Sequence, residues 1–352
     1  MNKKEETISK TNINWYPGHM AKTRKQIEAD LKMVDIVIEL LDARIPKASQ
    51  NPDIARITAG KKKIVVLNKC DLADEKKNSQ WISYFKKQGI PAVLTDSNTG
   101  KGIENCIKEI EKIMEEQMQK QAEKGRIGRK IRAMILGIPN VGKSSFINRI
   151  SKSTTAGVGN KPGVTKQKQW IRINDKIELL DTPGVLWPKF ESEDVALKLA
   201  FTGTIKEDIL QRTEIAYQLV KFLLENYQEK LIERYGLTES YIKETLNQEQ
   251  AENINIYEIM LEIGRKRGCI ISGGNIDEEK TSRIILDEFK NGKLGKITLE
   301  WCFWGRSKKT SLMKLKKCPK WTKMSKRKRP RWTERRLEIN EIYKFRKEWD
   351  WS

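Results

Sequence analysis

The sequence has a single histidine, His19, and only five cysteines among 352 residues. One imidazole excludes a metal cluster built on several histidines and any catalytic arrangement that uses more than one. The cysteines are scattered, odd in number and form no Cys-x-x-Cys pair, so neither a disulfide framework nor a zinc ribbon is expected. A reducing, cytoplasmic location fits this pattern best.

Long hydrophobic runs are also missing. No stretch of about 18 apolar residues exists, so we expect no membrane-spanning helix. The polar N-terminal residues MNKKEETISK lack the apolar segment of a secretory signal. Hydrophobic residues still make up 38% of the chain, which is enough to bury a core. At about 150 residues per domain, the length allows roughly two domains and some additional segments.

Negative charge is scarce relative to positive charge. The chain has 69 Lys and Arg against 47 Asp and Glu, a formal net charge of +22. Residues 1–190 carry a net charge of +15, residues 191–300 of −6 and residues 301–352 of +13. The excess favours a polyanionic partner, either nucleic acid or an anionic membrane face. The changes of sign suggest domain boundaries near residues 190 and 300.

The first 190 residues alternate between strand-like and helical stretches. Apolar runs predict strands within MVDIVIELLD, KKKIVVLN, AVL, RAMIL and KIELL, and residues 103–122 have isoleucines at helical spacing. This alternation predicts a mostly parallel, doubly wound α/β sheet, in which ligands bind at the carboxyl ends of the strands. Residues 191–300 have apolar positions at helical spacing and predict a small helical domain.

The segment Gly137-Ile-Pro-Asn-Val-Gly142-Lys143-Ser144 matches the phosphate-binding loop pattern between a predicted strand and a predicted helix. Its glycines allow backbone N–H groups to face phosphate oxygens, and the helix N-terminus adds positive potential. We expect Lys143 to reach the β- and γ-phosphates and Ser144 to bind Mg²⁺. The nucleotide contacts expected in this loop are Asn140, Val141, Gly142, Lys143, Ser144 and Ser145.

A second motif, Asn68-Lys69-Cys70-Asp71, follows a predicted strand. The carboxylate of Asp71 can accept two hydrogen bonds from guanine, from N1–H and the 2-amino group, where adenine has no donors. Alone the pattern is common in solvated turns, but beside a phosphate-binding loop it predicts GTP and GDP as ligands. After the next strand come Asp96 and Ser97, which we also expect to bind the nucleotide, with a backbone or hydroxyl group of Ser97 near guanine O6.

A third motif, Asp181-Thr-Pro-Gly184, ends another predicted strand. We expect Asp181 to hold Mg²⁺ through water and the N–H group of Gly184 to contact the γ-phosphate. Thr165 lies in a glycine-containing loop and is the candidate second Mg²⁺ ligand. Loops of this kind become ordered on the γ-phosphate and relax when it leaves.

All five guanine-nucleotide elements are therefore present, but the base-reading elements precede the phosphate-binding loop. This rotated order resembles the circularly permuted GTPases. The segments WYPGHMAK, LDARIP, DTPGVLWP and KRGCIISGG narrow the resemblance to the YlqF-type family, assembly factors of the bacterial large ribosomal subunit. The resemblance covers roughly residues 12–300.

The resemblance implies a circularly permuted P-loop GTPase domain over residues 12–190 and a mostly helical RNA- or ribosome-binding domain over residues 191–300. Residues 301–352 form a basic, tryptophan-rich extension, about which the family implies nothing. The implied activity is GTP hydrolysis during late maturation of the 50S subunit, stimulated by the particle. The implied partners are pre-50S particles, rRNA and ribosomal proteins, bound in a GTP-dependent way by a monomer, with no membrane. The alternative is a nucleotide-gated RNA-binding module in which hydrolysis is incidental.

Hydrolysis needs a group that orients the attacking water. Many GTPases use a glutamine directly after Asp-x-x-Gly, but this chain has Val185 there. The resemblance implies a catalytic part for His19, and the alternative is a turn residue that packs against the following helix. Asn140 resembles the asparagine with which related GTPases hold K⁺, and the alternative is an asparagine that favours a tight turn. Arg44 is a candidate arginine finger, although a structural role is preferred.

Two basic clusters are candidate RNA contacts. One lies in the predicted helical domain, where the alternative is a solvated helix end, and the other lies in the extension among interleaved tryptophans, where the alternative is a soluble basic tail. The residues are Arg265, Lys266 and Arg267 in the first cluster, and Lys326, Arg327, Lys328 and Arg329 in the second.

Overall fold

The computed structural model describes residues 17–126, 128–152, 170–182, 192–205, 212–248 and 252–302. Residues 17–23 are described by their backbone alone. The described chain as far as Cys302 belongs to one compact unit. None of the described helices has both the length and the apolar character that crossing a bilayer requires.

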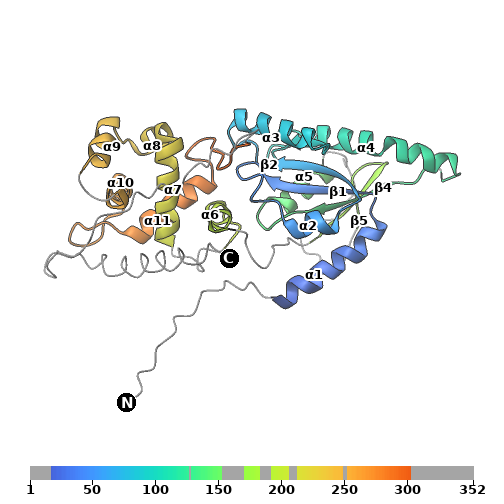
Figure 1. Ribbon diagram of the computed structural model, residues 1–352, viewed down its shortest axis with the longest axis horizontal. Helices are drawn as coiled ribbons and strands as arrows, with labels where there is room; N and C mark the ends of the chain where they lie inside the picture. Colours follow the sequence, from blue (N-terminus) through green and yellow to red (C-terminus); the bar gives the residue numbers. More distant parts are fainter. Residues whose placement is uncertain are drawn as a thin grey trace, which may run out of the picture. The chain divides into compact units, whose positions relative to one another are not determined.

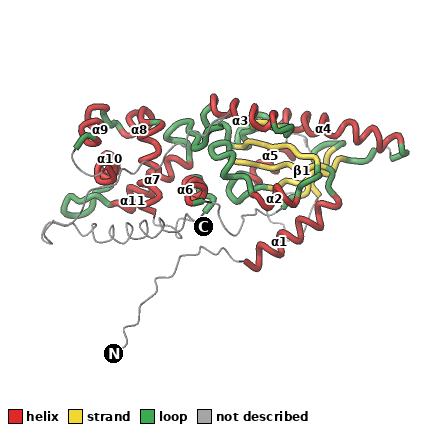
Figure 2. The backbone as a smooth tube through the Cα atoms, viewed as in Figure 1, coloured by secondary structure: helices red, strands yellow, loops and turns green. Residues whose placement is uncertain are grey.

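A six-stranded sheet forms the centre of the first part of the chain (Figures 1 and 2). Its order is β3-β2-β1-β4-β6-β5, and of these strands β5 alone is antiparallel to its neighbour. The strands are β1 (Ile36–Asp42), β2 (Lys62–Asn68), β3 (Ala92–Leu94), β4 (Ile131–Leu136), β5 (Trp170–Arg172) and β6 (Ile177–Leu180). The prediction of a mostly parallel, doubly wound sheet is confirmed, whereas the antiparallel edge strand β5 was not predicted.

Helices cover both faces of this sheet. The first half of the chain contributes α1 (Pro17–Asp30), a 3₁₀ turn (Leu31–Met33), α2 (Pro52–Ile57), α3 (Glu75–Lys87), α4 (Ile103–Glu123) and α5 (Lys143–Lys152). Val37 of β1 packs with apolar side chains of α1 and α2, and Leu41 of β1 packs with those of α3. Because residues an even number of positions apart point to the same face of a strand, α1, α2 and α3 lie on one face of the sheet. The reversal of strand order after β3 places α4 and α5 on the opposite face. Every residue of β1 is buried as a result.

The second part of the described chain is helical. It contains α6 (Glu193–Phe201), α7 (Arg212–Asn226), α8 (Gln228–Tyr235), α9 (Glu239–Leu246), α10 (Glu252–Lys266) and α11 (Glu278–Lys290). Ser192, Thr238 and Asp277 cap the N-termini of α6, α9 and α11 by accepting backbone hydrogen bonds. These helices agree with the helical spacing of the apolar residues in this part of the sequence.

The helical part and the sheet are joined by buried polar contacts. The carboxylate of Glu300 accepts backbone hydrogen bonds from Lys47 at 2.6 Å and from Ala48 at 3.1 Å, and its other neighbour is the ammonium group of Lys198 at 3.5 Å. Burial nevertheless raises the pKa of Glu300, with the two N–H groups and Lys198 opposing that rise. The predicted domain boundary near residue 190 therefore separates two parts that pack closely, and it stays a prediction.

Candidate nucleotide-binding site

The polar motifs meet at the carboxyl edge of the parallel strands. Asn68 ends β2, Asp96 and Ser97 follow β3, the phosphate-binding loop follows β4, and Asp181 follows β6. Parallel strands present their carboxyl ends at one edge, so these residues come together although they span more than a hundred positions. A parallel sheet with these motifs at its strand ends predicts this convergence.

Asn68 joins three of these segments. Its side chain is 1% exposed. The amide nitrogen donates to the carbonyl of Val141 in the phosphate-binding loop at 2.9 Å. The amide oxygen accepts from the hydroxyl of Ser97 at 2.7 Å, the Ser97 N–H at 3.2 Å and the hydroxyl of Thr95 at 3.2 Å. One buried asparagine thus fixes the base-reading loops relative to the phosphate-binding loop.

Lys69 adds a second link between the same segments. It has a positive φ of 59°, an uncommon conformation for a residue with a side chain. Its ammonium group donates to the backbone carbonyl of Asn140 at 2.6 Å and lies 3.1 Å from a carboxylate oxygen of Asp42. Burial would raise the pKa of Asp42, but the charges of Arg44 and Lys69 hold that pKa well below its usual range.

Asp71 is exposed at a cleft of about 310 Å³ whose lining also includes Asn68, Lys69, Ser97 and Ser145. Partial desolvation and the neighbouring charge of Asp96 raise the pKa of the Asp71 carboxyl. A carboxylate with weakened solvation has more to gain from two N–H donors of a ligand. This placement suits the guanine-reading part predicted for it.

Asp96 lines the same cleft and also holds its own loop. Its carboxylate accepts from the N–H group of Asn98 at 2.8 Å and from the hydroxyl of Thr99 at 2.6 Å. The side chain is 4% exposed, so it shapes its own loop. In this structure Asp96 therefore acts on the cleft by holding the loop that carries Ser97.

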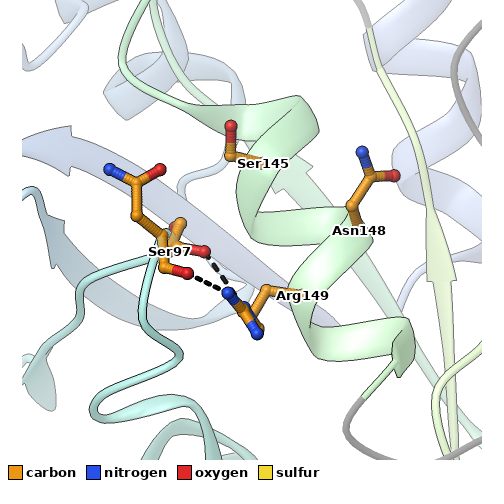
Figure 3. A pocket seen from close by; sticks show the side chains of 5 residues that line it. Ser97, Ser145, Asn148 and Arg149 are labelled. Atoms are coloured by element: carbon orange, nitrogen blue, oxygen red, sulfur yellow. Dashed lines mark hydrogen bonds between the residues drawn. The ribbon is translucent and has the colours of Figure 1, made fainter.

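Arg149 holds the same loop from the other side. This residue of α5 was missed in the sequence, where no spacing rule marks it. Its Nε group donates to the carbonyl of Ser97 at 3.2 Å, and its Nη2 group donates to that of Asn98 (Figure 3). Together with Ser145 and Asn148 these residues line a small pocket of about 250 Å³. The helix that follows the phosphate-binding loop is thus tied to the guanine-reading loop.

Lys143 lies over the phosphate-binding loop. Its ammonium group donates to the carbonyls of Gly137 at 2.9 Å and Ile138 at 3.1 Å. Burial lowers the pKa of Lys143 to about 8, and the charge of Asp181 only partly opposes that shift. Burial also raises the pKa of Asp181, against the charge of Lys143 and the Thr182 N–H group. The lysine and the aspartate are therefore electrostatically coupled.

The low pKa of Lys143 predicts a pH dependence of nucleotide binding. Below pH 8 the lysine is already charged, so its protonation costs nothing when phosphates bind. Above pH 8 binding must take up a proton, because the phosphates favour the ammonium form, and affinity should fall by about tenfold at pH 9. GTP affinity measured from pH 7 to pH 9 checks this. Lys143→Arg is the control, since guanidinium stays charged; an equal decline in both proteins would contradict the assignment.

The remaining predicted contacts are only partly described. Ser144 and Ser145 are exposed at the start of α5. Thr165 and Gly184 lie outside the described residues, as does the position of Val185. His19 lies in the first turn of α1, behind Pro17, rather than in a turn before the helix. A proline at the first helical position is favourable, which explains why the helix begins there.

Asn140 has a positive φ of 59° and an exposed side chain. Its amide nitrogen donates to the backbone carbonyl of Gly203, just after α6, at 2.6 Å. A K⁺ ion at this residue would therefore bind through the amide oxygen. The phosphate-binding loop is thereby in direct contact with the helical part of the chain.

Of the two basic clusters predicted to contact RNA, the structure describes only the one in the helical part of the chain. Arg265 and Lys266 are exposed at the end of α10. Arg267 is half-buried, with its guanidinium 3.2 Å from a carboxylate oxygen of Glu288 and over the ring of Tyr235 at 5.1 Å. Arg267 therefore stabilises the helical part through these contacts. The second cluster, Lys326, Arg327, Lys328 and Arg329, lies outside the described residues.

Comparisons with known proteins identify the family of this chain. Residues 132–258 match the family model described as 50S ribosome-binding GTPase. Curated relatives named ribosome biogenesis GTPase A include those of Bacillus cereus, 46% identical over 82% of this chain and 93% of its own, and of Priestia megaterium, 45% identical over 82% and 96%. A mitochondrial ribosome-associated GTPase 1 of Xenopus tropicalis is 34% identical over 64% of this chain and 74% of its own.

Solved structures that resemble this chain include two of YlqF. GNP-bound YlqF from Thermotoga maritima matches 80% of this chain and 98% of its own with a TM-score of 0.53 at 28% identity. A GDP-bound YlqF structure matches with a TM-score of 0.54 at 26% identity, covering 78% of this chain and 98% of its own. The predicted family resemblance is confirmed by the relatives at 44–46% identity. The chain belongs to the ribosome biogenesis GTPase A family.

Proposed function

We propose that this GTPase hydrolyses GTP to time its release from a maturing large ribosomal subunit. The observation that carries the nucleotide part is the position of Asn68, whose amide bridges the phosphate-binding loop at Val141 and the base-reading loop at Ser97. Family membership supports the ribosomal part, because relatives are named as ribosome biogenesis GTPases. The particle bound is a precursor of the 50S subunit, contacted through rRNA and ribosomal proteins by a cytoplasmic monomer.

Co-sedimentation tests this proposal. The full chain is mixed with large-subunit precursor particles in GDP or in a non-hydrolysable GTP analogue. More protein should sediment with the particles in the analogue, because binding depends on the γ-phosphate. Equal sedimentation in both nucleotides, or equal sedimentation with small subunits, would contradict the proposal.

We also propose Mg²⁺ as the resident metal. The exposed hydroxyl of Ser144 supplies the kind of hard oxygen ligand that Mg²⁺ prefers, and Thr165 would supply another. The exposed carboxylate of Asp181 would hold the ion through water. A bound Mg²⁺ supplies positive charge to the β- and γ-phosphates. Asn140 would hold K⁺ through its amide oxygen, while its amide nitrogen keeps the contact with Gly203.

His19 is proposed to orient the attacking water, because Val185 cannot. His19→Ala should leave GTP affinity within about twofold and lower the particle-stimulated rate by about 10²–10⁴-fold, the range for loss of a general acid–base or water-positioning group. Single-turnover hydrolysis and GTP binding, measured on the same preparation, check this. An equal loss of binding and rate would instead assign His19 to support of the fold.

The RNA contacts are proposed for the exposed pair Arg265 and Lys266 and for the basic cluster of residues 326–329. Exposed guanidinium and ammonium groups can neutralise phosphates, and tryptophans interleaved with them can stack on bases. Arg265 also forms an ion pair with Glu262 one turn earlier on α10, so an RNA phosphate would compete with that carboxylate for its guanidinium. The extension beyond residue 302 would then supply most of the electrostatic attraction to rRNA.

A further inference from the structure

The cleft that holds Asp71 has a second wall from the helical part of the chain. Lys290, the last residue of α11, and Asn291, its C-cap, line the cleft together with the base-reading residues. They stand more than two hundred positions from Asp71 in the sequence. No motif in the sequence marks them as nucleotide contacts.

Arg44 holds this end of α11 in place. Its side chain is 1% exposed, and its Nη1 group donates to the backbone carbonyl of Lys290 at 3.3 Å. The guanidinium lies over the ring of Phe289, 5.4 Å from its centroid. Two further hydrogen bonds, from Nε at 3.0 Å and Nη2 at 2.8 Å, join Arg44 to both carboxylate oxygens of Asp42. This buried geometry agrees with a structural role for Arg44 and not with an arginine finger.

The Arg44–Asp42 pair leads directly to the nucleotide loops. Asp42 also contacts the ammonium group of Lys69 at 3.1 Å, and Lys69 donates to the carbonyl of Asn140 at 2.6 Å. An unbroken series of polar contacts therefore runs from the end of α11 to the phosphate-binding loop. Breaking one member of a buried, charged series leaves its partners unsatisfied, so the series favours one arrangement.

Two backbone contacts fix the same region beside Asp71. The N–H group of Ile297 donates to the carbonyl of Leu72 at 3.0 Å. Gly292 has φ of 72°, and a Cβ atom there would lie 2.5 Å from Cδ2 of Leu72. The turn after α11 thus packs closely against the residue that follows Asp71.

We propose that the C-terminal end of α11 is part of the guanine site, with Asn291 as a ligand-contacting residue and Arg44 as a positioning residue. Nucleotide binding and packing of the helical part then stabilise each other, because coupling between two equilibria is reciprocal. This inference rests on the proposed function, since it assigns the cleft to the guanine base.

Hydrogen exchange on the full chain tests the coupling. GDP should slow amide exchange in residues 290–297 of the wild-type protein. In Arg44→Lys, which keeps the charge but loses the forked geometry, GDP should no longer slow exchange there, and the GDP dissociation rate should rise by about tenfold. A purely structural role for Arg44 would change exchange equally with and without GDP.

Asn291→Ala provides a test that does not depend on a buried group. Asn291 is exposed, so the variant should fold, and loss of one hydrogen bond to the ligand should weaken GDP binding by about 2- to 12-fold. Lys293→Ala, an exposed neighbour outside the cleft lining, is the matched control and should bind GDP as the wild type does.

The outcomes separate this inference from the function on which it rests. If the wild-type protein does not prefer guanine over adenine nucleotides, the proposed function fails. If it binds GDP tightly, yet GDP leaves exchange in residues 290–297 unchanged and Asn291→Ala binds GDP normally, the inference alone is overturned.

Discussion

Replacing Asp71 by Asn should lower affinity for GTP and GDP by about 100-fold and raise affinity for xanthine nucleotides. The wild-type carboxylate accepts two N–H groups of guanine, and a charged acceptor of this kind is worth about 3 kcal/mol, which corresponds to about 150-fold in affinity. Asparagine replaces one acceptor oxygen with a donor, which suits the carbonyl that xanthine has in place of the 2-amino group. Competition among GTP, ITP and XTP measures the change.

Inosine nucleotides supply an internal control for this experiment. They lack the 2-amino group, so the wild-type protein should prefer GTP over ITP, and Asp71→Asn should reduce that preference. An unchanged order of affinities in the variant would reject Asp71 as the residue that reads the base. Loss of affinity for all three nucleotides together would point to damage to the cleft.

Gly142→Ala is expected to abolish the link between the two nucleotide loops. Gly142 has φ of 96°, and a Cβ atom there would lie 2.4 Å from the amide nitrogen of Asn68. Asn68 must then move, and its hydrogen bond to Val141 is lost. We expect GTP affinity to fall by about tenfold, the upper end of the range for loss of one net hydrogen bond.

Gly125→Ala is the matched control for Gly142→Ala. Gly125 also has a positive φ, 77°, but nothing lies within 4 Å of the added Cβ atom. Both variants should lose about 1–2 kcal/mol of unfolding free energy from the unfavourable backbone conformation. Only Gly142→Ala should lose nucleotide affinity, as measured by binding and by chemical denaturation of both proteins. Similar affinities in the two variants would contradict the role given to the close approach at Asn68.

The nucleotide motifs were predictable because each is local. A strand, a polar turn and a helix follow one another within about twenty residues, and backbone geometry then dictates where Asn68, Lys143 and Asp181 lie. Parallel strands bring those turns to one edge, so the convergence of the site followed from the fold class. The rotated order of the motifs changes which strands are connected to each other, but the motifs still meet at the same edge of the sheet.

The contacts between distant segments were not predictable in the same way. Arg149 reaches the Ser97 carbonyl from a helix, and Arg44 reaches the Lys290 carbonyl across 246 positions. Such bonds depend on tertiary packing, for which residue type and spacing give no signal. Asp96 illustrates the limit within a motif, because residue type and spacing do not reveal that its carboxylate also accepts a hydrogen bond from its own loop.

The most direct measurement of the central claim is single-turnover GTP hydrolysis by the full chain, with and without large-subunit precursor particles. A GTPase that times its own release from the particle should hydrolyse GTP slowly when free and much faster on the particle, and it should dissociate as GDP forms. A particle that binds the protein in a GTP-dependent way but leaves the hydrolysis rate unchanged would contradict this account. That result would favour a nucleotide-gated RNA-binding module in which hydrolysis is incidental.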